Sequence, residues 1–93
     1  MDNKLDAARE QINKIDAEMA RLFAERMHAV EAVAGYKAEN GLQIRDENRE
    51  NQLVSRNLGY IADENKDILD AYAEFQRKVM DLSVKYQEKL IKK

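Results

Sequence analysis

The chain has 93 residues and a mass of 10.8 kDa, which is enough for one small domain, and we expect residues 1–93 to form it. It contains no Cys and one His, which excludes a disulfide framework and a Cys/His zinc site. The net charge of −2, the lack of a long apolar run and a start that is not a secretory signal predict no nucleic-acid partner, no membrane partner and a cytoplasmic location.

The residue types predict helix along nearly the whole chain. Pro and Thr are absent, whereas strong helix formers are abundant. Gly41 and Gly59 follow periodic segments, as C-terminal helix caps do, and Asp46 and Asn65 are good candidate N-caps. The predicted fold class is therefore all-α, with one long, one short and one medium helix. These helices are expected over residues 5–39, 46–58 and 64–91.

The length of the first helix bears on assembly. A helix of about 35 residues is roughly 50 Å long, whereas a compact chain of this size has a diameter of about 30 Å. A single copy cannot cover the whole apolar stripe of such a helix. We therefore expect an intertwined helical homodimer, in which a second copy covers the rest.

Two cations interrupt the apolar stripe of the first helix. Arg26 and Lys37 continue its spacing of three and four residues and fall near its middle. A buried cation needs an anion, so each could form a buried salt bridge or extend its charged end to water. Two cations on one buried stripe favour a third explanation, an anionic ligand. The apolar members of the stripe are Ile12, Ile15, Met19, Leu22, Val30 and Val33.

Arg9 lies at the edge of the same stripe, 28 positions before Lys37. On one straight helix the two are about 42 Å apart, so both cannot grip one small molecule within the same subunit. Arg9 is either a surface residue or, in an antiparallel dimer, a residue that reaches the Arg26–Lys37 region of the other chain.

The second predicted helix carries a charged face. Asp46, Arg49, Glu50 and Leu53 fall within about 100° of arc. Such a face is usually solvated, and without other context it does not indicate a site.

The third predicted helix has polar residues beside its apolar stripe. Ser83 and Gln87 are one turn apart along the border of that stripe. They could close a hydrogen-bond network in the core or face a ligand. The stripe itself comprises Ile68, Tyr72, Phe75, Val79, Leu82, Tyr86 and Leu90.

Taken together and in order, five segments resemble the all-helical chorismate mutases, the AroQ class. The resemblance covers about residues 5–90, and one departure is Gln43, where many relatives have Pro. Each segment is weak alone, but their order and spacing are specific. The segments are Leu5 to Asp16, Ala24 to Arg26, Ala34 to Lys37, Ile44 to Glu50 and Ser83 to Gln87.

The resemblance implies conversion of chorismate to prephenate in aromatic amino-acid biosynthesis, by a unimolecular Claisen rearrangement that needs no cofactor or metal. The protein has only to hold the compact conformer and stabilise developing charge. The dianionic substrate would then be the anion that the cations of the stripe require. By the family pattern, Lys37 and Gln87 hydrogen-bond the ether oxygen, where negative charge grows.

The family pattern also implies roles for the other polar residues. Arg26 and the Arg9 of the other subunit bind the substrate carboxylates, with Ser83 assisting. Glu50 accepts a hydrogen bond from the substrate hydroxyl. The pocket wall is completed by Asp46 and Arg49.

Two alternatives stay open at this point. Isochorismate pyruvate lyases share the fold and the cationic groups, although the pattern of Asp46, Arg49 and Glu50 favours the mutase. The chain could also be an inactive helical module for dimerisation or regulation. However, an inactive site has no reason to keep Arg26, Lys37 and Gln87 in a low-dielectric interior.

Overall fold

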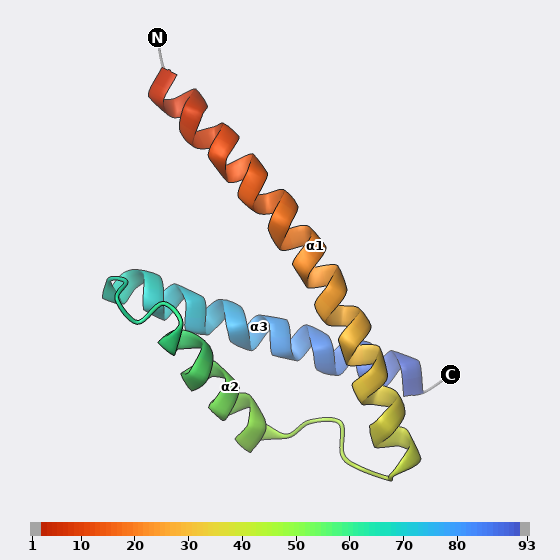
Figure 1. Ribbon diagram of the computed structural model, residues 1–93. Helices are drawn as coiled ribbons and strands as arrows, with labels where there is room; N and C mark the ends of the chain where they lie inside the picture. The colour runs from red at the N-terminus through yellow and green to blue at the C-terminus, as the bar shows by residue number, and fades with distance from the viewer. Residues whose placement is uncertain (1–2, 92–93) are drawn as a thin grey trace.

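The computed structural model describes residues 3–91 and contains three helices in that range, without a strand. Helix α1 (Asn3–Glu39) is followed by α2 (Glu47–Gly59) and α3 (Lys66–Ile91), as Figure 1 shows. The all-α prediction is confirmed, and each helix begins and ends within two residues of its expected position.

Side-chain caps begin the second and third helices, as predicted. The Asp46 carboxylate accepts a hydrogen bond from the backbone N–H of Arg49 at 3.1 Å. The Asn65 side-chain oxygen accepts from the backbone N–H of Ile68 at 2.9 Å. Each cap satisfies one of the backbone donors that a helix start leaves without an intrahelical partner.

The two predicted glycine caps have different outcomes. Gly41 has a φ of 63°, and the N–H of Leu42 donates to the carbonyl of Lys37 at 2.9 Å, the pattern of a Schellman cap. The prediction for Gly59 is wrong, because Gly59 is the last residue of α2 and does not have a positive φ. Tyr60 ends that helix in a right-handed conformation instead, and its N–H donates to the Asn57 carbonyl at 3.1 Å.

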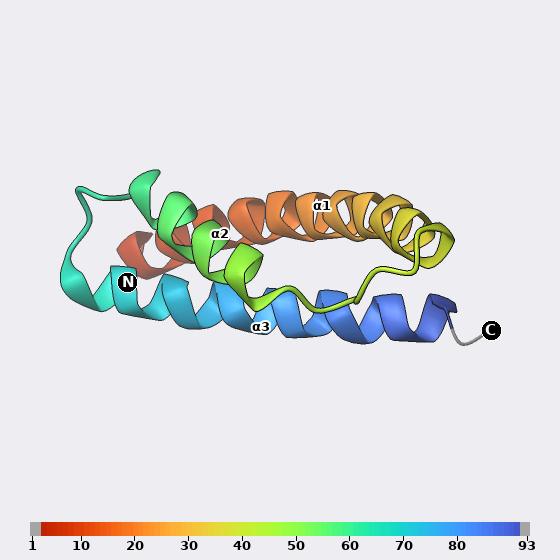
Figure 2. The ribbon, with the colours of Figure 1, turned by 90° about the horizontal axis from the view of Figure 1, so that it is seen from below.

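Helix α3 is the centre of the arrangement. It packs against both α1 and α2 (Figure 2), whereas α1 and α2 do not pack against each other within the described residues. The N-terminal half of α1 projects away from the other two helices (Figure 1). The radius of gyration is therefore 16.8 Å, against about 12 Å for a compact chain of this length.

Most of the apolar stripe of α1 is uncovered in the single chain. Only Val30 and Ala34 of this helix are buried, near its crossing with α3. No helix within residues 3–91 is long and apolar enough to span a membrane. The large apolar side chains exposed along the projecting half are Leu5, Ile12, Ile15, Met19, Leu22 and Phe23.

The buried face of α3 differs from the predicted stripe. Ile68 and Phe75 are each 46% exposed, because no element of the same chain covers them. Ser83 and Gln87, predicted at the border of the stripe, lie within the buried face. That face comprises Gln76, Val79, Met80, Ser83 and Gln87. The centre of the packing in one chain is therefore partly polar.

A hydrogen bond between side chains joins α1 to α3 near their crossing. The Tyr86 hydroxyl donates to the Glu31 carboxylate, which also contacts the His28 ring at 3.4 Å. The bond from Tyr86 is the main cause of a lowered pKa of Glu31, and the same bond raises the pKa of Tyr86.

The Tyr86→Phe variant is therefore expected to lose stability in a pH-dependent way. The pKa of Glu31 lies below its ordinary value of 4.5, so the stabilisation is full above that value and is lost as pH falls through the folded pKa. The pKa of Tyr86 lies above its ordinary value of 10.0, so the stabilisation is full below that value and is lost as pH rises through the folded pKa. Urea denaturation at fixed protein concentration checks this.

Tyr60→Phe is the matched control, because Tyr60 is 74% exposed, and its loss of stability should be near zero at every pH. A deficit of Tyr86→Phe that stays constant from neutral to strongly acidic pH would assign the effect to packing rather than to the hydrogen bond.

Candidate functional site

A cavity of about 360 Å³ lies between the C-terminal half of α1, the start of α2 and the C-terminal half of α3. Seven of the eight residues singled out in the sequence line it, the exception being Arg9. Apolar side chains of all three helices form the rest of the wall. The polar lining residues are Arg26, Lys37, Asp46, Arg49, Glu50, Arg56, Ser83 and Gln87.

Arg26 enters the cavity from α1 and is half-buried. Its Nη1 donates to the hydroxyl oxygen of Ser83 at 2.7 Å. That hydroxyl in turn donates to the carbonyl of Val79, one turn earlier in α3, at 2.8 Å. A neutral oxygen thus positions the guanidinium but does not neutralise it.

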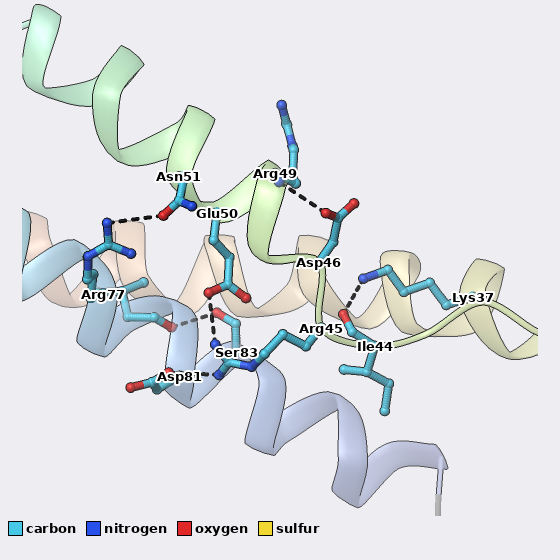
Figure 3. Close-up of polar contacts among 11 residues, drawn as sticks. Lys37, Ile44, Arg45, Asp46, Arg49, Glu50, Asn51, Arg77, Asp81 and Ser83 are labelled. Carbon is cyan, nitrogen blue, oxygen red and sulfur yellow. Dashed lines mark hydrogen bonds and ion pairs between the residues drawn. The ribbon is translucent and has the colours of Figure 1, made fainter.

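Lys37 enters the cavity about three turns further along α1 and is also half-buried. Its Nζ donates to the carbonyl of Ile44 in the loop between α1 and α2 (Figure 3). Within residues 3–91, neither Lys37 nor Arg26 forms an ion pair with a carboxylate. The described part of this chain therefore supplies no salt bridge to either cation, and an anion from outside it can pair with them.

Gln87 lies on α3 one turn after Ser83 and is 6% exposed. Its side-chain oxygen has no hydrogen-bond partner among the described residues. A buried polar atom without a partner costs about 1–3 kcal/mol. Since this side chain lines the cavity, a bound molecule can supply the missing partner, or can accept from the amide nitrogen once the amide turns over.

The start of α2 contributes the anionic part of the wall. The Asp46 carboxylate caps the helix, and Arg49 extends outward from the first turn (Figure 3). The Glu50 side chain is 15% exposed, and its Oε1 accepts from Nη1 of Arg45 at 2.9 Å. The charged face predicted for this helix is thus turned toward the cavity rather than only toward solvent.

The charge of the cavity wall is opposite in sign to that of the chain. Four cationic side chains and two carboxylates line the cavity, whereas the chain as a whole carries −2. A concave site lined mainly by one sign of charge concentrates ligands of the opposite sign. The cavity is therefore suited to a small molecule with more than one negative group.

Arg9 lies outside this cavity. It is exposed on the projecting half of α1, about 26 Å along the helix from Arg26. Within one chain it cannot reach a molecule in the cavity.

Sequence reasoning missed two residues that belong to this region. Arg56 lines the cavity from α2, and its spacing of seven and three residues after Arg49 and Leu53 places it on the same helix face, a signal that could have found it. Arg45 pairs with both Glu50 and Asp81. It lies in a loop, where no periodicity marks a face, so spacing alone could not have found it.

Comparisons with known proteins agree with this geometry. A family model described as chorismate mutase type II matches residues 8–88. The chain is 32% identical over 91 residues to a bifunctional chorismate mutase/prephenate dehydratase of Buchnera aphidicola subsp. Acyrthosiphon pisum. That match covers 98% of the chain but only 23% of the relative. No solved structure matches the chain.

Proposed function

Because the chain belongs to the chorismate mutase type II family, we propose that it converts chorismate to prephenate on the route to aromatic amino acids. One observation carries the proposal. Three helices bring Arg26, Lys37, Glu50 and Gln87 to one cavity. Within residues 3–91, neither Arg26 nor Lys37 has a carboxylate partner. The substrate is a dianion of a size that such a cavity accommodates.

The proposed roles follow from the partners that each group lacks. Arg26, held by Ser83, faces a carboxylate of the substrate, and this ion pair replaces the missing protein anion. Lys37 and Gln87 face the ether oxygen, where negative charge develops as its bond to carbon breaks. Glu50 accepts from the substrate hydroxyl.

The remaining proposed binding residues are on α2. Asp46 holds the first turn of the helix in place through its cap, and Arg49 and Arg56 add positive charge to the rim of the cavity.

The reaction explains the residue types in the cavity. The carbon–oxygen bond breaks and the carbon–carbon bond forms within one molecule, so no proton, electron or group passes to the protein. Catalysis then depends on holding the reactive conformer and on donors placed where charge grows. Donors of this kind are strongest where water is excluded, which agrees with the burial of Gln87.

The direct test is an assay for prephenate formation by the purified chain. The loss of chorismate absorbance measures the reaction, and acid converts the prephenate formed to phenylpyruvate for detection.

Lys37→Ala should lower kcat by roughly a hundred- to a thousandfold, the effect of removing one oxyanion donor. Isochorismate, assayed in parallel for salicylate, separates the mutase from the lyase. Wild-type protein that is folded but forms no prephenate would contradict the proposal.

Gln87 provides a pH test of its proposed role. An amide can donate to the ether oxygen at any pH, whereas a carboxylate repels the growing charge and donates only when protonated. Gln87→Glu is therefore expected to be active only under acidic conditions, with kcat falling about tenfold for each pH unit above the pKa of the new carboxyl. Ser55→Glu, a change on the exposed side of α2, is a control for added charge and should keep the wild-type profile.

We further propose that the working form is a homodimer in which Arg9 of each chain completes the cavity of the other. The uncovered apolar side chains of the projecting half of α1 support this, because isolated chains rarely leave so many exposed in one row. The distance of about 26 Å between Arg9 and Arg26 also requires a second chain, if Arg9 is to reach the substrate.

Mixing two inactive variants tests this arrangement. Arg9→Ala and Lys37→Ala homodimers should both be inactive, but refolding them together should restore activity. One cavity of each mixed dimer then has Lys37 from its own chain and Arg9 from the other. Random pairing gives about half mixed dimers with one working site in two, so activity should approach roughly a quarter of wild type.

Native mass spectrometry provides the control, since it measures the fraction of mixed dimers. Mixed dimers without recovered activity would mean that Arg9 acts in its own chain or has no role in the site.

A further inference from the structure

We propose that Arg45 is a positioning residue, which holds the Glu50 carboxylate at the cavity by tying the loop before α2 to α3. This inference rests on the proposed function. Glu50 lines the cavity, whereas Arg45 does not.

The guanidinium of Arg45 bridges two helices. Its Nη1 donates to Glu50 Oε1 at 2.9 Å, and its Nη2 donates to Asp81 Oδ1 at 2.7 Å (Figure 3). Glu50 belongs to the first turn of α2 and Asp81 to α3, two positions before Ser83. The hydrogen bond from Arg45 lowers the pKa of Asp81 and so favours the charged carboxylate that binds Arg45.

The neighbours of Arg45 are held as well. Lys37 donates to the carbonyl of Ile44, and Asp46 accepts from the N–H of Arg49. Three successive residues, 44 to 46, are thus each bonded to a different part of the site. Arg45 provides the only one of these contacts that reaches α3 among the residues described.

Stability alone does not account for the bridge. Exposed ion pairs contribute little to folding, and Arg45 and Asp81 are 39% and 50% exposed in their side chains. A guanidinium, however, presents its donors in a rigid planar fork, which fixes the direction of both partners. Glu50 is bonded through Oε1 only, within residues 3–91, so Oε2 remains available to accept from a ligand hydroxyl.

The first experiment compares Arg45→Gln with Arg77→Gln. Arg77 also bridges α3 to α2, through the Asn51 side chain at 3.2 Å, but neither residue lines the cavity, so Arg77→Gln controls for loss of charge and of an interhelix contact. Arg45→Gln should raise KM for chorismate on the order of tenfold with kcat within about twofold, because a contact made equally in ground and transition states affects KM alone. Arg77→Gln should match wild type.

A double-mutant cycle tests whether Arg45 acts through Glu50. If it does, the Arg45→Gln/Glu50→Gln protein should lose no more kcat/KM than Glu50→Gln alone. Losses that multiply would overturn the proposal, since they would mean that Arg45 acts independently of Glu50. Equal losses for Arg45→Gln and Arg77→Gln would overturn it too, by showing a general effect of weakened helix packing.

A measurement without substrate separates this inference from the proposed function. Backbone amide hydrogen exchange of residues 42–50 should be faster by about tenfold in Arg45→Gln and unchanged in Arg77→Gln. Exchange that is the same in both variants and wild type would overturn the positioning role even if the chain makes prephenate. Faster exchange in Arg45→Gln, together with a wild-type chain that makes no prephenate, would instead contradict the proposed function. It would still support the role of Arg45 in holding the loop before α2 to α3.

Discussion

Buried polar groups need hydrogen-bond partners, and this requirement determines how the three helices pack together. Helix α3 buries three polar side chains along the face that packs on the rest of the chain, and two of them bond to a neighbouring helix. Gln76 accepts from the Asn57 amide of α2 at 2.7 Å. Ser83 accepts from Arg26 of α1. Only Gln87 keeps an atom without a partner among the described residues, and it does so where the cavity lies.

Much of this fold could be predicted because its signals are local. Caps depend on a few adjacent residues, so Asp46 and Asn65 were identified from the sequence and Gly41 from its place after a periodic segment. The positions of Arg26 and Lys37 were also predictable, since a cation within an apolar stripe contradicts the pattern around it. This interruption of the apolar pattern can be recognised from the sequence alone, without knowing which residues surround Arg26 and Lys37 in space.

The rest depended on contacts between segments. The apolar pattern of α3 identifies every side chain whose exposure to water is unfavourable. It therefore includes Ile68 and Phe75, which no part of the same chain covers. Periodicity therefore placed Ser83 at the edge of the buried face, when it lies well inside it. Arg45 could not be found either, because a loop residue has no face, and its partner Asp81 is 36 positions away.

The hydrogen bonds of Ser83 limit how it can treat a carboxylate. A hydroxyl has one proton, and here that proton points to the carbonyl of Val79, while an oxygen lone pair receives Arg26. A carboxylate arriving beside Ser83 meets an oxygen with nothing left to donate. Either Arg26 binds the anion alone, or the hydroxyl rotates about its carbon–oxygen bond and leaves the helix carbonyl to its backbone partner. The Ser83 hydroxyl therefore has two orientations, one that donates to the Val79 carbonyl and one that donates to a bound carboxylate.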